Sequence, residues 1–97
     1  MNINQLMQQA QKMQKDMKKA QEEVSKMTFT SKKDLVEVEG NGNKEITKIV
    51  IDKEIEKDDI EALEDMILLA VNDVINQADK AMESKLGRYS NMMPGLF

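Results

Sequence analysis

Of all the features of the sequence, an uninterrupted heptad pattern of apolar residues near the N-terminus restricts the possible folds of this chain most strongly. The pattern consists of Ile3, Leu6, Ala10, Met13, Met17, Ala20, Val24 and Met27. This alternate spacing of three and four residues places every member on one narrow stripe of an α-helix, and no Gly or Pro interrupts it. A helix over residues 3–26 is roughly 36 Å long, against a radius of gyration of about 13 Å for a compact domain of this size. The pattern therefore predicts a long helix that needs a partner helix.

The middle of the chain changes from this helical period to the alternation typical of β-strands. Such alternation occurs in three segments, residues 27–30, 35–39 and 45–51. The segment GNGN at 40–43 has an Asn-Gly centre, which suits a type I′ hairpin turn. In the last strand Ile49 and Val50 point to opposite faces, so we expect part of this strand to be covered on both sides. These patterns predict a three-stranded antiparallel meander.

A second helical period follows the strands. Its apolar members are Ile60, Leu63, Ile67, Ala70, Val71, Val74, Ala78, Ala81 and Met82. Asp58, three residues before Glu61, is typical of a helix start, and Gly87 suits a left-handed helix end. We therefore expect a helix over residues 58–86, followed by an irregular tail at 88–97.

Together these elements predict an α+β fold, with a long N-terminal helix, a three-stranded antiparallel meander and a long C-terminal helix. Residues 1–97 fall within the size of one domain, and no linker divides them. Only 3% of the residues are aromatic, and a chain this short buries only about two-thirds of its unfolded surface. We therefore expect copies of the chain to associate.

The composition argues against catalysis. The chain has no His and no Cys, so it has neither an imidazole base nor a thiolate. Its glycines at 40 and 42 fall in the hairpin, and no phosphate-binding loop motif is present. The acidic cluster over residues 58–65 lacks EF-hand spacing, and we interpret it as helix capping and a solvated face. We expect no enzyme activity, no cofactor and no metal site.

The sequence also indicates a cytosolic protein without a membrane segment. Residues 1–10 lack the basic start and apolar run of a signal peptide. The longest apolar run, residues 66–71, is far shorter than the roughly 20 residues that span a bilayer.

Charge is unevenly distributed along the chain, although the net charge is only −4. Residues 1–27 carry five Lys against three acids, whereas residues 52–86 carry four Lys against eleven acids. On the first helix, the polar residues that could follow a phosphate backbone lie away from the apolar stripe, at heptad positions b, c and f. They are Gln5, Gln8, Lys12, Lys15, Lys18, Lys19 and Lys26.

Two other interpretations of the first helix remain open. Spacing alone favours a solvated face for the lysine row, because acids are spaced to pair with some of its members, such as Asp16 with Lys19 and Glu22 with Lys26. The methionines of the apolar stripe indicate irregular helix–helix packing, with an adaptable protein-docking surface as the alternative.

Three stretches of the sequence are distinctive: LMQQAQKMQKDMKKAQEEV at 6–24, DDIEALEDMILLAVNDVINQADK at 58–80 and NMMPGLF at 91–97. In this order, and over essentially the whole chain, they resemble the YbaB/EbfC family of bacterial nucleoid-associated proteins. The resemblance implies a tweezer-like homodimer in the bacterial cytoplasm and nucleoid that binds duplex DNA with modest sequence selectivity. It assigns DNA contact to helical arms, here residues 3–26 and 58–86.

The resemblance does not identify individual contacts, because the family has no fixed base-reading motif. In the acidic second helix, the candidates are the cations near its C-terminal end, Lys80, Lys85 and Arg88. The chain also departs from many relatives before the second strand, where residues 31–34 (SKKD) replace a glycine-rich connection.

Two hypotheses of different classes follow. The first is a non-catalytic, dimeric DNA-binding protein that holds duplex DNA mainly through its phosphates. The alternative is a scaffold or adaptor that binds a DNA repair or replication protein through the acidic helix or the Met-rich tail, as the family's gene neighbourhoods suggest. The net charge of −4 favours the alternative, and the resemblance favours the first.

Overall fold

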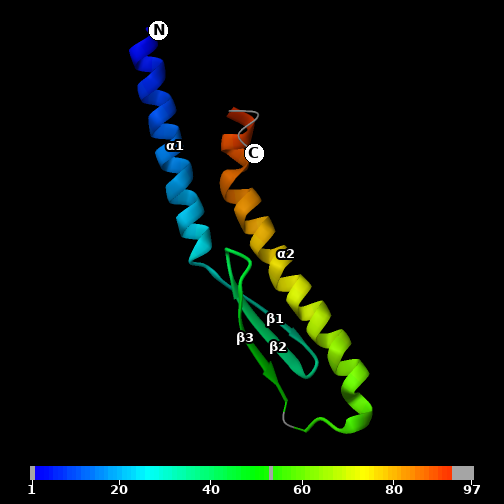
Figure 1. Ribbon diagram of the computed structural model, residues 1–97. Coiled ribbons are helices and arrows are strands. Elements are labelled where there is room, and N and C mark those ends of the chain that lie inside the picture. Colours follow the sequence, from blue (N-terminus) through cyan, green and yellow to red (C-terminus); the bar gives the residue numbers. More distant parts are fainter. Residues whose placement is uncertain (1, 53, 93–97) are drawn as a thin grey trace.

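A computed structural model describes residues 2–52 and 54–92, without the side chains of residues 88 and 90–92 (Figure 1). The elements are α1 (Ile3–Ser25), β1 (Thr28–Lys33), β2 (Val36–Asn41), β3 (Ile46–Ile51), the 3₁₀ helix η1 (Lys57–Asp59) and α2 (Ile60–Met92). The sheet is antiparallel, with strand order β1-β2-β3. The predicted α+β fold, a meander between two long helices, is confirmed.

The molecule is elongated rather than compact. Helices α1 and α2 run antiparallel, and the start of α1 projects past the end of α2 (Figure 1). The radius of gyration is 19.4 Å, and the extents are 70 × 20 × 13 Å. A compact domain of this size has a radius of gyration of about 13 Å. Much of each helix surface therefore has no cover from the rest of the chain.

The core lies where α2 crosses β1 and β2. Its fully buried members are Val36, Val38, Ala70 and Val74. Gly40 allows α2 to approach β2 closely, because a Cβ atom at this position would lie 2.7 Å from Val74 Cγ1. The sheet and α2 therefore form one packed unit, which fixes the direction of α2.

A second, smaller contact joins α1 to α2. Val24 is fully buried at the end of α1, and Leu86 and Tyr89 are 5% exposed near the end of α2. The hairpin between β2 and β3 also reaches this point, since a Cβ atom on Gly42 would overlap the carbonyl oxygen of Val24. The partner helix that the heptad pattern requires is thus α2, but only over the last turns of α1. Toward the other end of the helix, Leu6 is already 51% exposed.

The predicted ends of the second helix are wrong. Asp58 lies inside η1, and α2 begins at Ile60. The helix also continues through Gly87 as far as Met92, so the predicted irregular tail is wrong up to that residue, and residues 93–97 lie outside those described. Gly inside a helix costs only about 1 kcal/mol relative to Ala. Burial of the neighbouring Leu86 and Tyr89 outweighs this cost.

The predicted hairpin turn is also wrong. Asn41 belongs to β2, and the turn is centred on Gly42 and Asn43, closed by a 3.0 Å hydrogen bond from Lys44 N to Asn41 O. Lys44, with φ 65°, is the left-handed residue. A type I turn followed by a left-handed residue has this geometry. The Asn41 side chain favours it, because its Oδ1 accepts hydrogen bonds from the backbone N of Asn43 and Glu45.

The first strand is longer than the sequence predicts. It runs to Lys33 and pairs with the whole of β2. Asp34, with φ 53°, begins the two-residue turn between these strands. Ser31 and Lys33 therefore lie within a strand, where their side chains can reach α2.

Candidate nucleic-acid interface

The outer face of α1 carries most of the site residues predicted from the sequence. We call this surface the lysine face; it consists of Gln5, Gln8, Lys12, Lys15, Lys18, Lys19 and Lys26. All seven side chains are exposed, and Lys26 is the C-cap residue of α1. The last turns of the apolar stripe face α2 instead, with Val24 buried, so α2 does not cover the lysine face.

None of these lysines forms an ion pair with any described residue. The ion pairs in the described part of the chain are Lys33–Asp73, Lys44–Asp79 and Lys85–Glu23. Neither Asp16–Lys19 nor Glu22–Lys26, the pairs that the helical spacing allows, reaches salt-bridge distance. Five unpaired ammonium groups thus extend over roughly 21 Å of helix, a length that matches about six successive phosphates of one DNA strand.

The glutamines lie beside the first lysine of this face. Gln5, Gln8, Gln9 and Lys12 together line a shallow, open hollow of about 400 Å³. Amide N–H groups can donate hydrogen bonds to phosphate oxygens, next to the point charge of the ammonium group. The structure therefore brings Gln5 and Gln8 together with Lys12, as the sequence suggests.

A groove of about 500 Å³ separates α1 from α2 and contains one further candidate, Lys85. Lys19 and Lys85 line it from the two helices, but Asp16 and Glu23 line it as well. Lys85 Nζ lies 3.5 Å from Glu23 Oε2. The acids offset the attraction of this groove for phosphate, so Lys85 primarily joins the two helices.

The remaining candidates lie on α2. Lys80 is exposed, but its charge acts on Asp73, whose pKa it helps to lower, and it lies away from the lysine face. The Arg88 side chain lies outside those described, although its backbone belongs to α2. Of the two predicted α2 side chains that the structure describes, Lys85 is brought next to a member of the lysine face and Lys80 is not.

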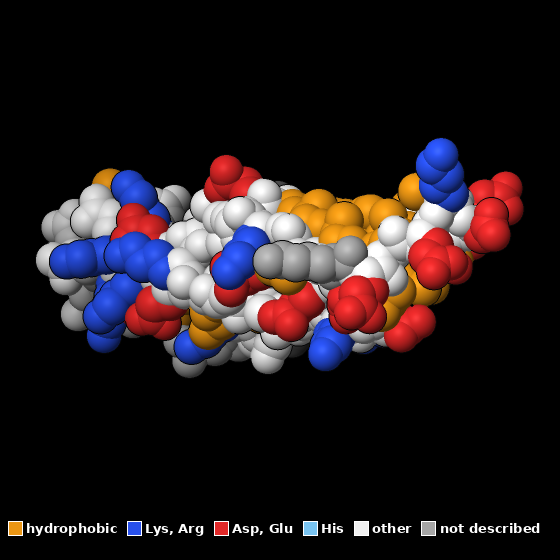
Figure 2. All heavy atoms as spheres, turned by 90° about the horizontal axis from the view of Figure 1, so that it is seen from below, with side chains coloured by type: hydrophobic (Ala, Val, Ile, Leu, Met, Phe, Trp, Pro, Cys, Tyr) orange, Lys and Arg blue, Asp and Glu red, His pale blue; other side chains and the backbone are white. Residues whose placement is uncertain are grey.

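The two charge types occupy different ends of the molecule. In the view from below, Lys side chains gather toward the α1 side with a few acids between them, whereas Asp and Glu side chains predominate near the start of α2 (Figure 2). Among the described residues, the acidic end includes Asp58, Asp59, Glu61, Glu64 and Asp65. A polyanion would therefore be attracted to α1 and repelled from the start of α2.

Between these ends lies an exposed hydrophobic area, which the sequence did not predict (Figure 2). Ile49, Val50 and Ile51 of β3 are 38–47% exposed, so the described residues of one chain do not provide the predicted cover on both faces of this strand. On α2, Leu68 and Leu69 are about 60% exposed. The sequence does show apolar residues on both faces of this strand. It cannot show whether the residues that pack against them belong to the same chain or to a second copy.

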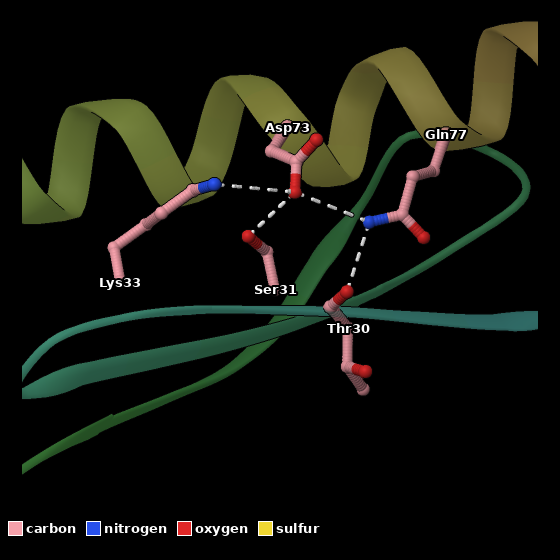
Figure 3. A network of polar contacts seen from close by, with 5 residues as sticks. All are labelled: Thr30, Ser31, Lys33, Asp73 and Gln77. Carbon is pink, nitrogen blue, oxygen red and sulfur yellow. Dashed lines mark hydrogen bonds and ion pairs between the residues drawn. The ribbon is translucent and has the colours of Figure 1, made fainter.

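A polar network that the sequence also did not predict fixes α2 across β1 (Figure 3). Ser31 Oγ donates a 2.6 Å hydrogen bond to Asp73 Oδ2, and Gln77 Nε2 donates to Thr30 O at 2.8 Å. Lys33 Nζ lies 4.0 Å from the same Asp73 oxygen. The pKa of Asp73 is lowered, first by the hydrogen bond from Ser31 and further by the charge of Lys33, while desolvation opposes the shift. The network has a structural role, since it sets the angle of the helix that α1 packs against.

Two other kinds of site are absent from the part of the chain that the structure describes. No group of three or more His, Cys, Asp or Glu side chains there is arranged to hold a metal ion. No helix there is long and apolar enough to span a lipid bilayer.

The fold and its charged surface define a small α+β protein with projecting antiparallel helices and a cationic outer helix face. The sequence matches the YbaB/EbfC DNA-binding family over residues 1–93. The chain belongs to this family.

Similar proteins and a similar structure agree with this assignment. Nucleoid-associated proteins of Streptococcus thermophilus and Lactococcus lactis are 40% and 41% identical over 97 residues, and each match covers 97% of this chain and 98% of the relative. The crystal structure of the uncharacterized protein HP0035 from Helicobacter pylori superimposes with a TM-score of 0.73 at 26% identity, covering 95% of this chain and 97% of that one. The shared architecture therefore extends over nearly the whole chain rather than one segment of it.

Proposed function

We propose that this protein is a non-catalytic, nucleoid-associated DNA-binding protein that holds duplex DNA mainly through its phosphates. The unpaired lysines of the lysine face carry the proposal, because their charge is available to an external anion. The name of the family and those of the relatives support DNA as the partner and the nucleoid as the location. Lys acts as a point charge on phosphate and carries little base information, so binding should be weakly selective.

The negative net charge is compatible with this function because the acidic cluster at the start of α2 lies apart from the lysine face. The acidic start of α2 is at the opposite end of an elongated molecule, whose longest extent is 70 Å. At physiological ionic strength the Debye length is only about 8 Å, so these acids are screened from DNA held on α1. Their repulsion instead favours one orientation, with the duplex along α1.

A homodimer is the second part of the proposal. The chain exposes 7419 Å², against about 5,700 Å² expected for a compact monomer of its mass. The excess includes the exposed apolar residues of β3, a sheet edge whose backbone groups no other strand pairs within the described chain. A second copy on this edge would bury them and double the number of lysine faces, which steepens the salt dependence of DNA binding.

The test is a titration of random-sequence duplex at several salt concentrations. Replacing Lys12, Lys15 and Lys19 by Ala should weaken binding and reduce the slope of log K against log salt concentration by about 0.9 for each phosphate that is no longer neutralised. A charge-matched control replaces the exposed Lys32, Lys48 and Lys57, which lie on the sheet and before α2. Equal effects of the two triple variants would exclude α1 as the site.

The adaptor hypothesis remains as a second candidate, supported by the acidic start of α2 beside the 48% exposed Ile60. In this case a repair or replication protein binds the acidic end or the C-terminal segment. The hypothesis predicts weak DNA binding at physiological salt and stable capture of such a protein. Deleting residues 90–97 separates an interface on this segment from one on the helix.

A further inference from the structure

The first turns of α1 expose all their side chains and carry no charge. Residues 2–9 are exposed throughout and contain no Asp, Glu, Lys or Arg. This segment, which we call the amide tip, extends past the described end of α2 (Figure 1). Most of its side chains are amides, and the others are apolar. The amides are Asn2, Asn4, Gln5, Gln8 and Gln9, and the apolar residues are Ile3, Leu6 and Met7.

The amide tip continues the lysine face, but with different chemistry. Successive members of one helix face are spaced by three and four residues, and here they are Gln5, Gln8, Lys12 and Lys15. Gln5, Gln8 and Gln9 line the same shallow hollow as Lys12. Among the described residues, none of these three glutamine side chains has a hydrogen-bond partner. DNA held on the lysines therefore lies next to free amides that carry no charge.

A single helix can enter the major groove of DNA, whereas a pair of helices cannot. The groove is about 12 Å wide, and a helix with its side chains is about 10–12 Å across. From Asp16 onward α1 lies beside α2, and the two helices line a groove that includes Tyr89. Two helices packed at the usual spacing of about 8–10 Å are together about 20 Å wide, so this part stays at the level of the phosphates. The amide tip, which no described part of α2 flanks, can reach the bases.

We propose that the amide tip enters the major groove of duplex DNA and reads adenine–thymine base pairs. The inference rests on the proposed DNA binding and adds to it a base selection that lysines on phosphate do not supply. The amide of Gln can donate to adenine N7 and accept from adenine N6 at the same time. Gln5 and Gln8 have Cβ atoms about 5–6 Å apart, a separation that spans one to two base-pair steps of about 3.4 Å.

An apolar side chain beside the glutamines favours the same base pair. Leu6 is 51% exposed and flanks the glutamine side of the helix, since it follows Gln5 and precedes Gln9 by three residues. The C5 methyl group of thymine lies in the major groove and accepts apolar contacts. Guanine is read best by Arg or Lys, and the amide tip has neither. The tip thus has a suitable partner for each half of an A·T pair and none for guanine.

Binding to two duplexes that differ in base composition tests the inference. The duplexes have equal length and identical ends, with either A·T or G·C pairs at the centre. The wild type should bind the A·T duplex about fivefold or more tightly. Replacing both Gln5 and Gln8 by Ala should abolish this preference and leave the salt dependence unchanged, because no charge is removed. The matched control replaces Gln14 and Gln21, two exposed glutamines of α1 outside the tip and the lysine face, and should keep the preference.

Modified bases test whether the contact lies in the major groove. An A·T duplex with 7-deazaadenine lacks the N7 acceptor but keeps its base pairing, so the wild type should lose most of its preference for it. Uracil in place of thymine removes the C5 methyl group and should weaken binding by the wild type but not by Leu6→Ala. A preference that survives 7-deazaadenine would mean that DNA shape is read instead, which would overturn the inference.

The remaining outcomes separate this inference from the proposed function. Equal binding of the two unmodified duplexes by the wild type would overturn the base readout alone. An equal loss of affinity for both duplexes in the double Gln5 and Gln8 variant, with the preference kept, would assign these glutamines to phosphate and also overturn it. No binding of either duplex at low salt would overturn the proposed DNA binding, and the base readout with it.

Discussion

Ser31 on β1 donates a 2.6 Å hydrogen bond to Asp73 on α2, 42 residues further along the chain. Ser31 is only 6% exposed, so its hydroxyl group needs this acceptor. The contact closes α2 onto the outer strand of the sheet and thereby sets the direction in which α2 meets α1. A surface on α1 is thus positioned, in part, by a polar pair between the sheet and α2.

Acid should weaken the contribution of this pair. The folded pKa of Asp73 lies below its ordinary value of 3.8, first because of Ser31. Asp73 therefore stabilises the fold fully above the unfolded pKa and progressively less as pH falls through the folded one. Asp73→Asn should lower the urea midpoint at about pH 6, and its difference from the wild type should shrink toward about pH 3. Glu64→Gln, on an exposed part of α2, is the control. If the midpoint of Asp73→Asn differed from that of the wild type by the same amount at both pH values, the result would argue against the network.

Two glycines should respond to alanine in opposite ways. A Cβ on Gly42 would overlap the carbonyl oxygen of Val24, so Gly42→Ala must displace the hairpin from α1 and should cost about 1–3 kcal/mol or more. Gly87 lies inside α2, and apart from its chain neighbours and the backbone of its own helix no described atom lies within 4 Å of its Cβ position, so Gly87→Ala should gain about 0.5–1 kcal/mol. Urea unfolding at one fixed protein concentration measures both. Loss of stability in Gly87→Ala would mean that α2 is not helical there.

The exposed edge strand should determine the dimer. Val50 is 47% exposed within one chain, so Val50→Lys should leave the fold of each chain intact but place charge in the proposed interface. Light scattering at low concentration should then give the mass of one chain. Thr28→Lys, on the opposite sheet edge, should still give the mass of two. Two chains for both variants would place the interface elsewhere.

The sequence predicts the elements well because their patterns are local. The heptad stripe, the alternation of the strands and the second helical period each correspond to an element of the structure. The errors occur where tertiary contacts decide. Packing of Leu86 carries α2 through Gly87, and the crowding at Val24 together with the Asn41 side chain shifts the hairpin turn by one residue.

The candidate site is predicted less completely. Helical period alone places the lysines of α1 opposite its apolar stripe, but it cannot show that they lack ion-pair partners among the described residues, because rotamers decide which spaced pairs form. It also cannot show that Lys85 is paired with Glu23 across the helices. How much of the apolar stripe on α1 stays exposed depends on where α2 ends. Gly87 in the sequence predicts that end too early.

The central claim, that duplex DNA lies along the outer face of α1, is tested most directly by locating the bound DNA. An iron chelate that generates hydroxyl radicals can be attached through Gln8→Cys on the lysine face or through Glu64→Cys at the acidic end, because the chain has no other cysteine. Strong cleavage of bound duplex from position 8 and little from position 64 is the predicted result. Cleavage mainly from position 64, or equally from both, would contradict the account.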